Sequence, residues 1–137
     1  MPHMERVDAA PTPFAEASRE VAEQLATSNQ PGDPRAWAAI YLAVEAWRQL
    51  ADDTGAWDYF GLEVLDVRAR HYYDQHVEVL VGAACSDLDT RAAVCEMVTQ
   101  LAGHHARIAA SETLQLVDRL SHDATARQLQ RAVAALL

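Results

Sequence analysis

The stretch "DPRAWAAIYLAVEAWRQL", residues 33–50, decides the fold class of this chain. It begins with Asp33, a residue type favoured at helix N-caps, followed by Pro34, which is favoured at the first helical position. Only three residues between positions 36 and 50 are strongly polar. A helix that is apolar on nearly all sides lies at the centre of a core, or is shared between the core and a partner. We therefore predict a helical domain built around this segment.

The rest of the chain shows the same helical punctuation, with periodic segments separated by short breaks rich in Gly, Pro, Asp or Ser. Helices are expected over residues 13–28, 34–51, 58–85, 90–110, 111–120 and 123–137, with a continuous or kinked helix through Ser111 as an equal alternative. Asp123 is interpreted as the N-cap of the last helix, and not as the partner of His122 in a phosphotransfer motif. We predict an all-α fold, a single-domain bundle of five or six helices with a long central helix at about 58–85. Residues 1–12 are expected to form a flexible N-terminal segment, and residues 13–137 the helical domain.

Charge and composition limit the function classes. The chain has 20 acidic and 11 basic residues, a formal net charge of −9, and every basic residue is arginine. An acid excess repels phosphate, so we expect no direct binding of nucleic acid. The absence of lysine excludes Schiff-base and phosphate-loop lysine chemistry. No apolar run has the length of a membrane span or a secretion signal, so we expect a cytoplasmic protein, of bacterial type, without a membrane partner.

The stretch "RARHYYDQHVEVL", residues 68–80, is the most suggestive for chemistry. On a continuous helix His71 and His76 point about 140° apart, so they cannot hold one ion. His71, Asp74 and Glu78 share one face and form a weak surface candidate for a metal site. The ordinary explanation of these three residues is a solvated polar face. We therefore expect no bound metal and no other cofactor.

The opposite face of the same predicted helix carries Tyr72, Tyr73 and His76. His105 lies on the inward stripe of the next predicted helix, and together these four residues are our candidates for a pocket. If the two helices form an antiparallel hairpin, His76 and His105 are offset by about 10 Å along the axis, too far to share an ion. We expect no catalytic residue among them, because none of the common catalytic motifs is present.

Trp37, Tyr41, Trp47 and Trp57 are the candidate interface residues, since aromatic side chains on an apolar helix are typical anchors of protein interfaces. We expect a non-catalytic protein-binding module: a regulatory or adaptor subunit, or an antitoxin- or immunity-type inhibitor of a basic partner. Its apolar helix would also support a homo-oligomer, such as a dimer. The alternatives are a helical protein that binds a ligand, a metal or haem, or a small enzyme, through an inward histidine.

Overall fold

The computed structural model describes residues 10–74 and 77–137 of the chain. Its helices are α2 (Phe14–Leu25), α3 (Pro34–Leu50), α4 (Ala56–His71), α5 (Leu88–Ala109) and α6 (Leu116–Leu136). Within the described residues all regular structure is helical, which confirms the prediction of an all-α bundle. None of the helices there combines the length and the hydropathy needed to span a bilayer.

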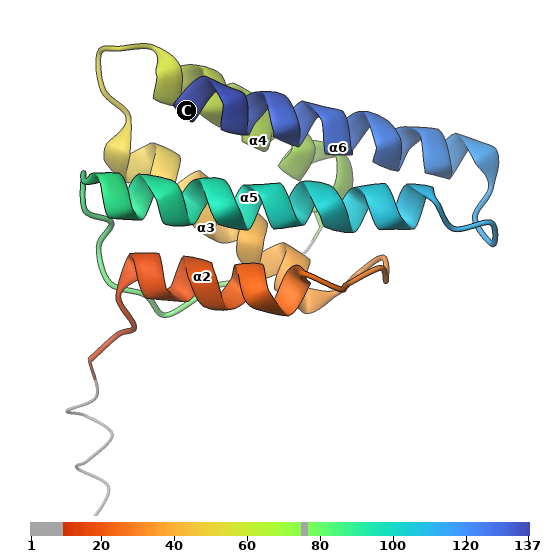
Figure 1. Ribbon diagram of the computed structural model, residues 1–137, viewed down its shortest axis with the longest axis horizontal. Helices are drawn as coiled ribbons and strands as arrows, with labels where there is room; N and C mark the ends of the chain where they lie inside the picture. Colours follow the sequence, from red (N-terminus) through yellow and green to blue (C-terminus); the bar gives the residue numbers. More distant parts are fainter. Residues whose placement is uncertain (1–9, 75–76) are drawn as a thin grey trace, which may run out of the picture.

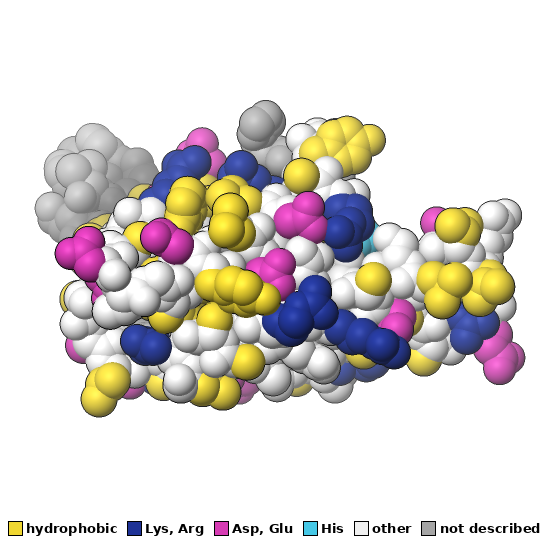
Figure 2. Space-filling view, turned by 90° about the horizontal axis from the view of Figure 1, so that it is seen from above, with side chains coloured by type: hydrophobic (Ala, Val, Ile, Leu, Met, Phe, Trp, Pro, Cys, Tyr) yellow, Lys and Arg dark blue, Asp and Glu magenta, His cyan; other side chains and the backbone are white. Residues whose placement is uncertain are grey.

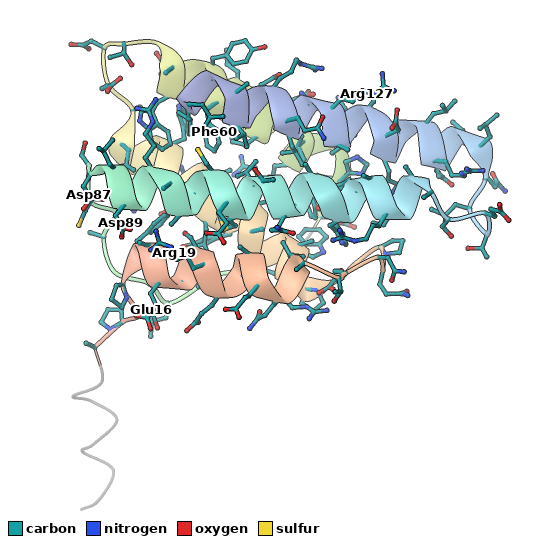
Figure 3. All side chains as sticks on the ribbon, viewed as in Figure 1. Glu16, Arg19, Phe60, Asp87, Asp89 and Arg127 are labelled. Carbon is teal, nitrogen blue, oxygen red and sulfur yellow. The ribbon has the colours of Figure 1, made fainter. Side chains whose placement is uncertain are left out.

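The helices form two layers. In Figure 1, α2, α5 and α6 run side by side across the view, with α3 and α4 behind them. Helix α5 packs against α2, α3 and α6, while α4 packs against α3 and α6. At one edge, Arg19 of α2 forms an ion pair of 2.7 Å with Asp89 at the start of α5 (Figure 3). Helix α5 is therefore central to the front layer.

Helix α3 is buried around most of its circumference, as its sequence predicts. Its buried residues are Ala36, Trp37, Ala39, Ile40, Leu42, Ala43, Val44, Ala46 and Leu50. The predicted cap is confirmed, because the Asp33 side chain accepts a hydrogen bond from the backbone N–H of Arg35, with Pro34 in the first turn. Asp87 caps α5 in the same way, through the N–H of Thr90 at 2.7 Å.

The predicted long helix at 58–85 is wrong, because α4 ends at His71. Residues 77–85 run as an extended segment, in which Val77, Val79 and Val81 are partly buried while Glu78 and Leu80 are exposed. Period-two burial and β-branched residues are typical of an extended chain. Val81 forms an isolated bridge with Thr12, and the longest helix described is α5, Leu88–Ala109.

The predicted break at Asp123 is also wrong. Helix α6 is continuous over Leu116–Leu136, and Asp123 lies inside it, paired with Arg127 at 3.1 Å. The break falls earlier, at residues 110–115, so the fifth and sixth predicted helices are largely one. On the face seen in Figure 2, apolar side chains gather at the end where α6 begins, and Leu116, Val117 and Leu120 are exposed there.

Close packing between α3 and α4 depends on Gly61. A Cβ atom at this position would overlap the indole edge of Trp47, at its Cδ1 and Nε1 atoms. At Gly103 in α5, an added Cβ would lie closest to the guanidinium of Arg107, with Nη1 at 3.1 Å. This guanidinium, which is hydrogen-bonded to the carbonyls of Ser28 and Leu25, has to shift by only a few tenths of an ångström, whereas the indole of Trp47 would have to move much further.

We predict that Gly61→Ala destabilises the protein by about 1–2 kcal/mol, because overpacking outweighs the gain in helix propensity. Gly103→Ala is the matched control, a glycine-to-alanine change inside another helix. It should leave the free energy of unfolding unchanged or raise it by up to about 1 kcal/mol. Chemical denaturation measures both values. Equal effects of the two substitutions would contradict the packing argument.

Candidate metal centre

Three histidines from three helices converge between α4, α5 and α6. They are His71 at the end of α4, His105 near the end of α5 and His122 in the first half of α6. Nδ1 of His105 lies 2.8 Å from Nδ1 of His122. The ring centroid of His71 lies 5.0 Å from that of His105 and 4.8 Å from that of His122. One ring nitrogen of each residue can be chosen so that all three lie within 4.8 Å of one another.

Tyr72 holds the innermost of these rings. Its hydroxyl lies 2.7 Å from Nε2 of His105, and both side chains are buried. Trp37 packs edge-to-face against the Tyr72 ring, with centroids 4.7 Å apart, and so fixes the phenol from the other side. Burial, followed by the charge of Asp33, raises the pKa of Tyr72, so its hydroxyl stays protonated. If that hydroxyl donates to Nε2, His105 carries its proton on Nδ1 and donates it to His122.

Thr125 of α6 holds the ring of His71. Its hydroxyl oxygen lies 2.7 Å from Nε2 of His71 and also accepts a hydrogen bond of 3.2 Å from Arg70. Arg70 in turn forms an ion pair of 2.7 Å with Asp66 one turn earlier on α4. These contacts fix the last turn of α4 against α6 and leave His71 half-buried beside His122.

The three imidazoles are neutral at neutral pH. Burial is the main cause, and the charges of His122 and Arg70 add to it, lowering the pKa of His71 to about 4. Burial and the neighbouring histidines hold the pKa of His105 well below its usual range. The pKa of His122 is lowered by burial, against the opposing charge of Asp118. Neutral imidazoles are the form that binds metal ions.

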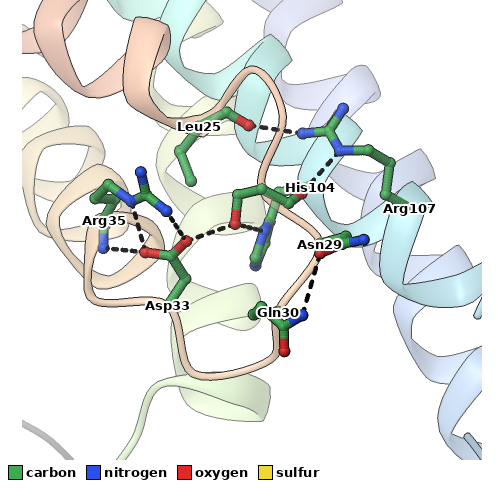
Figure 4. A network of polar contacts seen from close by, with 8 residues as sticks. Leu25, Asn29, Gln30, Asp33, Arg35, His104 and Arg107 are labelled. Atoms are coloured by element: carbon green, nitrogen blue, oxygen red, sulfur yellow. Dashed lines mark hydrogen bonds and ion pairs between the residues drawn. The ribbon is translucent and has the colours of Figure 1, made fainter.

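His104, next to His105 in sequence, belongs to a different network (Figure 4). Its Nδ1 lies 2.9 Å from the hydroxyl of Ser28, which donates a 2.6 Å hydrogen bond to Asp33. Since the only hydroxyl proton of Ser28 goes to Asp33, His104 must donate from Nδ1. Arg35 completes the network with an ion pair of 2.6 Å to Asp33, so this histidine ties the α2–α3 connection to α5.

The weak surface candidate formed by His71, Asp74 and Glu78 assumed a shared helix face, and this assumption is wrong because α4 ends at His71. Asp74 and Glu78 are exposed, while His71 faces α5 and α6. Among the pocket candidates, Tyr72 and His105 are brought together, and Tyr73 is exposed. His76 lies outside the described residues.

The candidate interface residues are mostly covered within the chain itself. Trp37 and Trp57 are buried in the core, while Tyr41 and Trp47 are half-buried. Of these four aromatic residues, only Tyr41 and Trp47 therefore offer surface to a partner through α3. Binding of a basic protein partner and self-association remain predictions.

Reasoning from sequence missed His122 as a site residue. With Asp123 taken as the start of a helix, His122 fell outside it. In the continuous α6, His122 precedes Ala126, Leu129 and Val133 at spacings of four, seven and eleven, on the inward stripe. The helical phase of that stripe, extended back by one turn, would have pointed to it.

Comparisons of the chain with protein-family models, with curated proteins and with solved structures find no match. The geometry of the three histidines is therefore the main guide to function.

We predict that the metal-free protein loses stability as the pH falls from about 6.5 toward 4. An unfolded histidine binds a proton below about pH 6.5, whereas folded His71 stays neutral to about pH 4. The unfolded state thus takes up more protons in this window, and the free energy of unfolding falls by about 1–2 kcal/mol, after allowance for partial exposure. Chemical denaturation at several pH values, with chelator present, measures the slope.

His71→Asn is the control for the carboxylates that titrate in the same window. Its pH slope should be shallower than that of the unchanged protein, because the variant keeps every acidic group and lacks the histidine. Identical slopes would show that the acid sensitivity arises elsewhere.

We also predict that Asp33→Ala costs more stability than Asp87→Ala. Both carboxylates cap a helix, a role worth about 1 kcal/mol. Asp33 is in addition buried and hydrogen-bonded to Ser28, so its loss should cost about 2–4 kcal/mol. Equal losses in denaturation experiments would mean that the buried network contributes nothing beyond the cap.

Proposed function

We propose that this protein binds one transition-metal ion, of the zinc class, through His71, His105 and His122. The observation that carries the proposal is the convergence of one ring nitrogen from each residue within 4.8 Å. The proposal corresponds to the metal-binding alternative drawn from the sequence, with His105 and His122 beside His71 in place of the Asp74 and Glu78 of the weak surface candidate.

The separations of the ring nitrogens, which reach up to 4.8 Å, have to adjust to those around a tetrahedral ion. With Zn–N distances of about 2.0–2.1 Å, ligand nitrogens lie roughly 3.4 Å apart. The contact of 2.8 Å between His105 and His122 is shorter than this value. In the proposed complex His105 carries its proton on Nε2 and donates it to the Tyr72 hydroxyl, which frees Nδ1 for the ion, and small rotations of the rings adjust the distances.

Hydrogen bonds from the protein already fix the orientation of two of the three rings, as they do for histidines that bind metal ions. Metal-bound histidines usually have their second nitrogen hydrogen-bonded to the protein, which fixes ring orientation. Tyr72 supplies this partner to Nε2 of His105, leaving its Nδ1 for the ion. Thr125 steadies the ring of His71.

The three nitrogen donors determine which class of metal ion the site can bind. Three neutral imidazoles suit zinc, copper, nickel or iron, whereas calcium and magnesium require oxygen ligands. Three protein ligands leave at least one coordination position for water or another small ligand.

The test is metal binding by full-length protein after treatment with a chelator. His3 and His76 lie outside the described residues, so both are replaced by Gln in every protein compared. We expect one equivalent of Zn²⁺ to bind, measured by calorimetry and elemental analysis. His105→Asn and His122→Asn should each weaken binding by roughly 100-fold or more.

His104→Asn is the matched control, since His104 is the adjacent residue, equally buried, and keeps a donor for Ser28 as Asn. It should bind zinc like the parent protein. Circular dichroism checks that each variant is folded. The proposal fails if the parent binds no zinc in competition with a weak chelator, or if His122→Asn binds it as well as the parent does.

A further inference from the structure

A groove with a volume of about 520 Å³ lies between α3 and the C-terminal half of α4, and Tyr73, Val77 and Glu78 line it beyond the end of α4. Its volume lies within the range of small-molecule sites, about 300–1,000 Å³. The ring of Tyr72 lines the groove, while its hydroxyl points to His105. The groove is thus separate from the histidine cluster, and a ligand can bind in it without a metal ion in that cluster.

The wall of the groove is rich in aromatic rings. Trp37, Tyr41, Tyr72 and Tyr73 all line it, together with aliphatic residues such as Val44. The Trp37 and Tyr72 rings are held edge-to-face and are buried, so this part of the wall is rigid. Aromatic faces attract organic cations and also pack against flat apolar groups.

The charges near Tyr41 favour a positive ligand. Burial is the main reason that the pKa of Tyr41 is raised, and the charges of Glu45 and Glu78 come next, ahead of the opposing charge of Arg48. Glu45 and Arg48 form an ion pair of 3.4 Å, with side chains 23% and 59% exposed. The carboxylate is therefore the less screened partner of this pair.

Two further electrostatic features bear on the choice of ligand, namely the charge of Arg68 and the net charge of the whole chain. Arg68 also lines the groove, and it is exposed, as Glu78 is, so solvent and salt screen both of these charges and the partly buried Glu45 is the stronger attraction for a cation. The whole chain carries a formal net charge of −9, which attracts cations over a longer range.

We propose that this groove is a binding site for an organic cation with a flat apolar body, such as an aromatic amine. The apolar body packs against Trp37 and Val44, and the ammonium group lies near Tyr41 between Glu45 and Glu78. Size, aromatic lining and the two carboxylates together define this class of ligand.

The test uses two fluorescent probes with the same ring system and opposite charge, monodansylcadaverine and dansyl-6-aminohexanoate. Each is titrated into metal-free protein in chelator, so that neither outcome depends on the histidine cluster. We expect the cationic probe to bind roughly five-fold more tightly than the anionic one, and less tightly at high salt. Equal affinities, or tighter binding of the carboxylate, would overturn the proposal.

Substitution of the two carboxylates tests whether the cationic probe binds in this groove. The double substitution Glu45→Gln with Glu78→Gln should weaken binding of the cationic probe by roughly five-fold. Its control, Glu23→Gln with Glu112→Gln, removes the same total charge from exposed positions outside the groove. An equal loss in the control would reduce the effect to net charge and contradict a local site.

Ala69→Phe tests the volume of the groove, because Ala69 lines it and is exposed, so a larger side chain there fills space without disturbing the core. Binding of both probes should be lost in this variant, with an unchanged circular dichroism spectrum. Retained binding would place the probes elsewhere and overturn the proposal.

Discussion

The burial of α3 is the constraint on which the rest of the structure depends. A helix that is apolar on nearly all sides has to be enclosed, and α2, α4 and α5 supply the surfaces that cover it. Ala46 and Gly61 show how close the packing is, since the first is fully buried and the second admits no Cβ beside Trp47. The enclosure sets the position of α4, and α4 in turn positions the site residues at its end.

The end of α4 connects the core to the candidate metal centre. Tyr72 follows the last helical residue, packs under Trp37 and directs its hydroxyl to His105. The same turn of chain presents His71 to α6, where Thr125 holds it. Because the rings of Trp37 and Tyr72 also line the groove beside α3, one buried aromatic pair supports both proposed sites.

Two neighbouring histidines on α5 illustrate how position decides chemistry. His104 and His105 are equally buried, yet the first donates to Ser28 in a network anchored by Asp33, while the second joins two other imidazoles. A carboxylate near His104 offsets part of the cost of burying it. For His105, burial and then the charges of the neighbouring histidines hold the pKa well below its usual range.

The sequence by itself determined the helical class, the cap at Asp33 and the inward direction of His105, because each depends on residues within a few positions along one helix. Only the tertiary structure decided that α4 stops at His71, where burial of alternate valines against the core replaces further helical turns. It also decided that His71 and His122 meet His105. Periodicity shows which face of a helix is buried, but which buried faces meet depends on packing between helices distant in sequence.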